Sequence, residues 1–202
     1  MFWVFFIPGI SLPDPKRTFI PFETARELSR IFFYNIPVII LLIFILYRED
    51  KKLIASKFAV HRPIVQWFIS NFILILGFSL VISVFSQHFM PDYKPPLIQA
   101  PKTFGAWVVM IIGSFATAYL EEIFFRLYLL YRFDRAGIPI MTGNLVSILL
   151  FSLCHLYEGP MGTLNAAIAS LCFTTVYRKS NNIHSPAWAH GLYNVMAFAF
   201  GI

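Results

Sequence analysis

The chain has 202 residues, of which 58% are hydrophobic and only 13% are charged. A soluble domain carries about 25% charged residues, so this composition excludes a soluble globular protein, and its richness in large apolar side chains excludes a disordered chain. A mean hydropathy of +0.69 predicts an integral membrane protein. The two cysteines, Cys154 and Cys172, lie inside apolar stretches, which excludes a disulfide-stabilised secreted scaffold.

The net charge of +6 comes from basic residues that lie between apolar stretches and form no continuous face. Nucleic acid is therefore not a predicted partner. Basic residues beside membrane spans mark cytoplasmic loops, so we place the densest group, in residues 48–62, in the cytoplasm. Alternation of the spans puts a second basic group there too: Arg132, Arg135, Arg178 and Lys179. An N-terminal group fits this orientation poorly: Lys16, Arg17, Arg26 and Arg30.

The first apolar segment, residues 1–10, has no basic region, no small-residue cleavage site and a proline within it. We predict an interfacial or re-entrant segment there, not a signal peptide. About six later stretches have the length and apolarity of membrane-spanning helices: 31–47, 64–85, 104–131, 140–156, 161–177 and 185–202. The proline-rich residues 87–102 form a loop that separates N-terminal membrane segments, 1–103, from a C-terminal core, 104–202. The fold class is therefore all-α, a polytopic transmembrane helix bundle.

Two adjacent acids follow the apolar stretch that starts at position 104. Ionisable residues in membrane helices cost about 3 kcal/mol on insertion scales and mark functional sites. Glu122 and Arg126 are four residues apart, which predicts an ion pair on one helix face. Glu121 lies about 100° around the helix from Glu122, so it points elsewhere and is the candidate general base.

Two histidines lie within later apolar stretches. The pattern Asn144, Ser147, Phe151 and His155 places mostly polar residues on one inward face. Counting back from the turn near residues 133–137 puts Glu121 and His155 at comparable depth, where they can share one water molecule. His190 and Asn194 are again four residues apart and present two hydrogen-bond donors, as a developing oxyanion requires. A straight-helix count leaves His190 offset from His155 by roughly 10 Å.

Three short motifs occur in order: Glu121 and Glu122 with Arg126, Phe151 with His155, and His190 with Asn194. They resemble the EExxxR, FxxxH and HxxxN motifs of the CAAX prenyl protease and bacteriocin-processing (CPBP) family of intramembrane glutamic endopeptidases. The resemblance implies a buried polar active-site cavity, in which Glu121 and His155 activate a water. It implies that His190 and Asn194 bind the oxyanion, while Glu122 and Arg126 organise the site.

Other protease chemistries require motifs that can be looked for directly in the sequence. The sequence has no HExxH motif of zinc proteases and no rhomboid-like Gly-x-Ser-Gly. We predict no cofactor, although zinc held by Glu122, His155 and His190 is a metal-dependent alternative.

The predicted substrate is a membrane-anchored peptide or protein, with or without a prenyl group, and lipid is the surrounding partner. A non-catalytic alternative stays open, either an immunity or scaffold factor or a proton-coupled carrier that uses the same buried charges. We predict a multi-pass protein of the bacterial cell membrane, with the endoplasmic reticulum membrane as the alternative.

Overall fold

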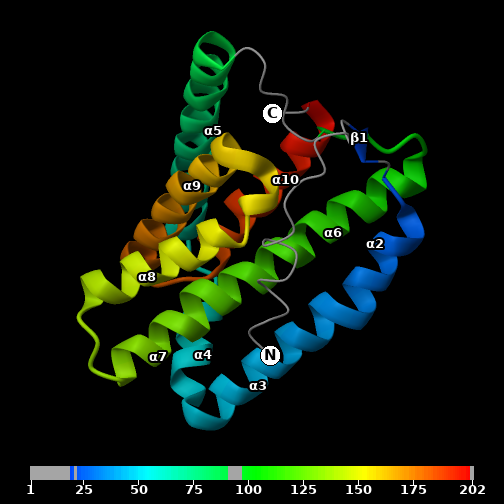
Figure 1. Ribbon diagram of the computed structural model, residues 1–202. Helices are drawn as coiled ribbons and strands as arrows, with labels where there is room; N and C mark the ends of the chain where they lie inside the picture. The colour runs from blue at the N-terminus through cyan, green and yellow to red at the C-terminus, as the bar shows by residue number, and fades with distance from the viewer. Residues whose placement is uncertain (1–18, 21, 91–96, 201–202) are drawn as a thin grey trace.

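The computed structural model describes residues 19–20, 22–90 and 97–200, and its long elements are helices (Figure 1). The elements in chain order are β1 (Phe19–Ile20), α2 (Thr24–Arg30), η1 (Ile31–Asn35), α3 (Ile36–Glu49), α4 (Lys51–Phe58), α5 (Pro63–Phe89), β2 (Leu97–Ile98), α6 (Phe104–Glu122), η2 (Ile123–Leu129), α7 (Leu130–Arg135), α8 (Ile140–Leu153), η3 (Leu156–Glu158), α9 (Gly159–Ser180) and α10 (His184–Phe200). The two short strands pair in parallel. The predicted all-α helix bundle is confirmed, whereas the predicted segment 1–10 lies outside the described residues.

Two long helices each contain a short π-helical stretch. The elements α2, η1 and α3 form one continuous helix, Thr24–Glu49, and α6, η2 and α7 form another, Phe104–Arg135. Asn35, at the end of η1, is buried and donates a hydrogen bond to Thr117 Oγ1 of α6 at 3.1 Å. Figure 1 shows the first helix lying along the second. This polar contact therefore joins the two helices.

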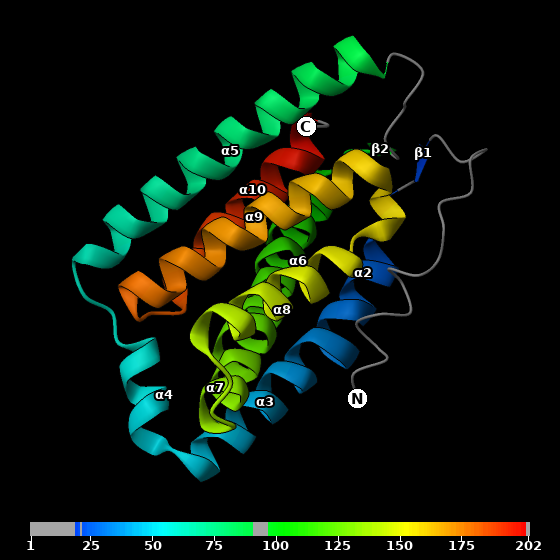
Figure 2. The ribbon, with the colours of Figure 1, turned by 60° about the vertical axis from the view of Figure 1, so that its left-hand side comes forward.

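The helix α10 packs between α6 and α5, while α9 packs against both α5 and α8 (Figure 2). The close approach of α10 to α6 depends on Gly191, because a Cβ atom at this position would lie 2.6 Å from the Phe115 ring. The buried core includes Ile123, Phe151 and Phe173, which come from the second long helix, α8 and α9. Helices distant in sequence thus enclose the centre of the second long helix.

Within the described residues the six predicted apolar stretches are mainly helical, but fewer of them can cross a membrane as single straight helices. Three are long and apolar enough among the described residues, Thr24–Glu49, Pro63–Phe89 and Phe104–Arg135. α8 and the segment Leu156–Ser180 meet at a bend of 49°. If they count together as one broken span or a re-entrant loop, the number of candidate spans is four. The 14 residues of α8 extend about 21 Å, which is less than a hydrocarbon core of about 30 Å. The predicted count of about six spans is therefore approximate.

Two ion pairs connect the basic ends of α7 and α9 to neighbouring helices at one end of the bundle. Arg132 of α7 donates two hydrogen bonds to Glu49 of α3, at 2.7 and 2.9 Å. Arg178 of α9 binds Asp134 at 2.7 and 3.1 Å. Burial and the nearby Arg178 guanidinium lower the pKa of Lys57 in α4. The positive-inside rule predicts that this end is cytoplasmic.

Candidate active site

The two adjacent acids lie where the α-helical part of the second long helix ends. Glu121 and Glu122 are the last residues of α6, and the π-helical η2 that follows contains Arg126. π-Helical turns are rare in proteins, and many of those that do occur lie at functional sites. Ser147 of α8 is fully buried and donates a hydrogen bond to the Phe125 carbonyl at 2.9 Å. This bond satisfies a buried backbone acceptor and fixes α8 against the turn.

The carboxylate of Glu122 has two cationic or potentially cationic partners on one oxygen. Arg126 Nη1 donates to Glu122 Oε1 at 3.0 Å, and both side chains are completely buried. His190 Nδ1 lies 3.0 Å from the same oxygen. A carboxylate oxygen accepts, so Nδ1 of His190 carries the hydrogen and Nε2 is the ring nitrogen left for other partners.

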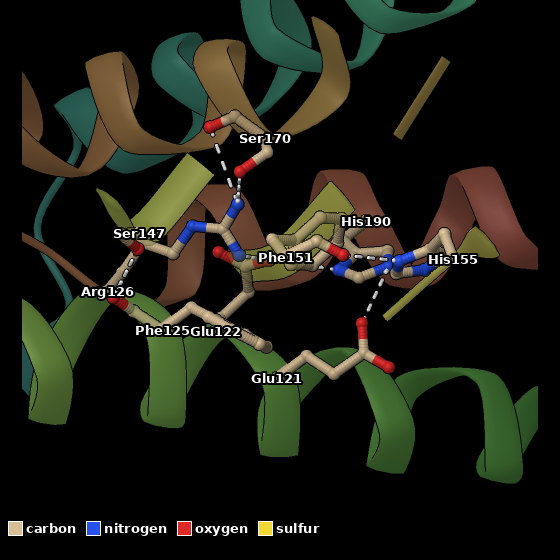
Figure 3. Close-up of polar contacts among 9 residues, drawn as sticks. All are labelled: Glu121, Glu122, Phe125, Arg126, Ser147, Phe151, His155, Ser170 and His190. Carbon is tan, nitrogen blue, oxygen red and sulfur yellow. Dashed lines mark hydrogen bonds and ion pairs between the residues drawn. The ribbon is translucent and has the colours of Figure 1, made fainter. Parts of the chain in front are cut away.

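The guanidinium of Arg126 is surrounded by aromatic rings. Its Cζ atom lies 4.5 Å from the centroid of Phe151 and 5.2 Å from that of Phe173, within the range of cation–π attraction. Nη2 donates to Ser170 Oγ of α9 at 2.8 Å. The ion pair with Glu122 is thus held by α6, α8 and α9 together (Figure 3).

The His155 ring lies just beyond the end of α8 and hydrogen-bonds back to it. Nδ1 is 2.9 Å from the carbonyl oxygen of Phe151, one of the last carbonyls of that helix. Because a carbonyl only accepts, Nδ1 carries the hydrogen, and a neutral ring keeps a lone pair on Nε2. The ring also stacks on Phe151, with centroids 4.6 Å apart. The Nε2 atom of His155 is therefore the ring nitrogen left to accept a hydrogen bond.

Glu121 is the more exposed acid of the pair. Its Oε2 lies 3.7 Å from His190 Nε2, and its side chain is 20% exposed, whereas that of Glu122 is fully buried. No described residue donates a hydrogen bond to this oxygen. Figure 3 shows the carboxylate directed toward the two imidazole rings. Glu121 Oε2 is thus a buried oxygen that has no hydrogen-bond donor among the described residues and takes no part in the Glu122–Arg126 hydrogen bond.

A small cavity of about 60 Å³ adjoins these groups. Three predicted site residues line it: His155, His190 and Asn194. The offset of roughly 10 Å expected from a straight-helix count does not keep His190 from the cavity that His155 lines. Such a cavity has room for water, which needs about 10–15 Å³ per molecule. Glu121 does not line the cavity, but its carboxylate lies next to His190, which does.

Sequence reasoning missed several polar residues of this region. Ser170 lies in a run of small and apolar residues, and its role depends on a contact with Arg126, 44 residues earlier. Asn165 and Tyr193 line the cavity, and both bind Ser79 of α5. A polar residue among apolar helix positions was the available signal, but the sequence does not state which helices meet.

The three side chains of the zinc alternative, Glu122, His155 and His190, already have protein partners. Glu122 Oε1 is occupied by Arg126 and His190, and His155 Nδ1 binds a backbone carbonyl. Across the described ranges, no group of three or more His, Cys, Asp or Glu side chains is placed to hold a metal ion. These bonds use one oxygen of Glu122 and the Nδ1 atoms of His155 and His190, so the three side chains are not gathered as ligands, and the zinc alternative stays a prediction.

Fold and site together define a polytopic helical membrane protein in which two imidazoles and an amide line a small cavity beside two adjacent carboxylates. Residues 103–196 match the family described as type II CAAX prenyl endopeptidase Rce1-like. This match contains all three motifs and confirms the resemblance over that stretch. No curated protein and no solved structure matches the chain significantly. The family implies intramembrane protease activity of the CAAX type, with a membrane-associated protein as the substrate.

Proposed function

We propose that this protein is an intramembrane glutamic endopeptidase that hydrolyses a peptide bond of a membrane-anchored protein through a water activated by Glu121 and His155. The observation that carries the proposal is the shared position of His155, His190 and Asn194 on one cavity, with Glu121 3.7 Å from His190. A prenyl group on the substrate and a bacterial cell membrane as the location are further parts of the proposal.

The first step is proton transfer from water to the Glu121 carboxylate. His155 Nε2 has a lone pair when Nδ1 donates to Phe151, so it accepts a hydrogen bond from the same water and orients it. A positioned general base contributes about 10²- to 10⁴-fold to such a step. The oxygen of the water forms a bond to the scissile carbonyl carbon, and the carbonyl oxygen becomes an oxyanion.

The oxyanion is stabilised by His190 and Asn194. His190 Nδ1 is bound to Glu122, so Nε2 can donate only when the ring is an imidazolium. The buried carboxylate of Glu122 holds the His190 ring through Nδ1, which gives the Glu122–Arg126 pair a positioning role. Collapse of the tetrahedral intermediate breaks the C–N bond, and Glu121 transfers its proton to the leaving amine.

The test is cleavage of a defined substrate by purified protein in liposomes. The probes are peptides with one membrane anchor, prenylated or acylated, and mass spectrometry of the products identifies the bond that is cut. We expect cleavage by the wild type and a loss of at least 100-fold in His155→Ala. His61→Ala is the matched control, because His61 is exposed before α5, outside the site. Equal cleavage by His155→Ala and the wild type would contradict the proposal, as would no cleavage of any anchored peptide by the wild type.

A further inference from the structure

A second polar cluster lies beside the cavity and has no part in the mechanism above. Ser79 of α5, Asn165 of α9 and Tyr193 of α10 contact one another pairwise. Ser79 Oγ is 2.7 Å from Asn165 Oδ1 and 2.9 Å from Tyr193 Oη. Asn165 Nδ2 donates to Tyr193 Oη at 2.8 Å. Three polar side chains from three helices therefore form a closed triangle inside an apolar bundle.

Counting hydrogens shows what the triangle leaves unused. Asn165 Oδ1 can only accept, so the single hydrogen of Ser79 goes to it. The Tyr193 oxygen accepts from Asn165 Nδ2, and the hydrogen of Tyr193 returns to Ser79 Oγ. This ring uses three hydrogens, and a ring with the amide reversed also uses three. In both cases one N–H of the Asn165 amide stays outside the ring.

The unused N–H belongs to a residue that lines the catalytic cavity. Asn165 and Tyr193 share this lining with His155, His190 and Asn194. Tyr193 directly precedes Asn194 in α10, so the triangle adjoins the predicted oxyanion site. Ser79 is only 8% exposed, and its bond to Oδ1 fixes the orientation of the amide.

We propose that Asn165 binds a backbone carbonyl of the substrate peptide, next to the scissile bond, through this unused N–H. The inference rests on the proposed peptidase function. A peptide that enters the bilayer in an extended form has carbonyl groups that lipid cannot satisfy, so the enzyme must supply donors. Asn165 supplies one such donor, while Ser79 and Tyr193 hold its amide in place.

The experiment measures peptide binding without turnover, in a Glu121→Gln background reconstituted in liposomes. The probes are fluorescent membrane-anchored peptides in which one carbonyl near the scissile bond at a time is replaced by a methylene group. Asn165→Leu removes the donor at similar size. Asn71→Leu is the matched control, because Asn71 is a fully buried asparagine of α5 that does not line the cavity.

One neutral hydrogen bond is worth about 0.5–1.5 kcal/mol, or roughly two- to tenfold in Kd. We expect one carbonyl replacement to raise Kd by that factor when Asn165 is present and to have no further effect in Asn165→Leu. We expect Asn71→Leu to keep the full sensitivity to that replacement. Equal sensitivity in the Asn165→Leu variant would overturn the inference.

A second variant keeps the test decisive if the leucine disturbs folding. Asn165→Asp has nearly the same shape and no N–H, so it should also lose the sensitivity to the carbonyl replacement, and retention of that sensitivity would overturn the inference. Cleavage by the wild type is measured separately. If the wild type cleaves no peptide, the proposed catalytic function fails and the inference falls with it. If the wild type cleaves and the Asn165 variants keep the sensitivity to the carbonyl replacement, the inference alone fails.

Discussion

Glu122 binds His190 through the ring nitrogen that faces away from the other acid: Nδ1 lies 3.0 Å from Glu122 Oε1, while Nε2 lies 3.7 Å from Glu121 Oε2. One imidazole thus separates two adjacent carboxylates with different environments. Glu122 is fully buried beside Arg126, and Glu121 is partly exposed. This difference underlies the proposed division of tasks, positioning for Glu122 and proton transfer for Glu121.

The buried ion pair is predicted to be essential for stability. Glu122→Gln removes the negative charge beside Arg126, and a buried guanidinium without a counterion costs about 3–5 kcal/mol. We expect a clear fall in the midpoint of thermal unfolding in detergent. Glu49→Gln is the control, because the Glu49–Arg132 pair is exposed and such pairs contribute about 0–1 kcal/mol. A Glu122→Gln protein that unfolds at the wild-type temperature would disprove this role.

Gly191 is predicted to set the distance between α10 and α6. In Gly191→Ala the new Cβ atom would lie 2.6–2.9 Å from three carbons of the Phe115 ring. Overpacking of this kind costs about 1–3 kcal/mol and would displace the neighbouring His190 from Glu122. We expect lower thermal stability and a lower kcat.

Gly77→Ala provides the comparison for Gly191→Ala. A Cβ atom at position 77 of α5 meets nothing within 4 Å. Replacement of glycine by alanine inside a helix is itself favourable by up to about 1 kcal/mol. We expect equal or higher stability and unchanged cleavage. If the two alanine variants behaved alike, the close packing at Gly191 would not matter for the site.

Chelation tests the metal-free mechanism. The amide, imidazole and carboxylate groups described above account for each proton without a metal, so treatment with a chelator is expected to leave the cleavage rate unchanged within about twofold. The assay is initial rate before and after dialysis against chelator. Loss of activity that added zinc restores would instead favour the metal-dependent alternative.

Local spacing was enough to predict part of this structure. The four-residue interval between Glu122 and Arg126 predicts their contact, and the contact forms at 3.0 Å. Apolar stretches of suitable length predict the helices. Both properties depend on neighbours along the chain, which a sequence shows directly.

The features that could not be predicted from the sequence depend on packing between distant parts of the chain. The π-helical turn at Ile123–Leu129 and the 49° bend after α8 both depart from the straight α-helix assumed in the depth count. The contacts of Arg126 with Ser170, and of Ser79 with Asn165, join residues 44 and 86 positions apart. Such contacts depend on which helices become neighbours, and no local pattern specifies that.

The central claim is that Glu121, and no other acid, takes the proton from the attacking water. The most direct test compares kcat for wild type and Glu121→Gln on one anchored peptide, with thermal unfolding of both proteins. We predict a fall in kcat of at least 100-fold with little change in the unfolding midpoint, because Glu121 lies outside the Arg126 ion pair. Wild-type turnover by a folded Glu121→Gln protein would contradict the claim.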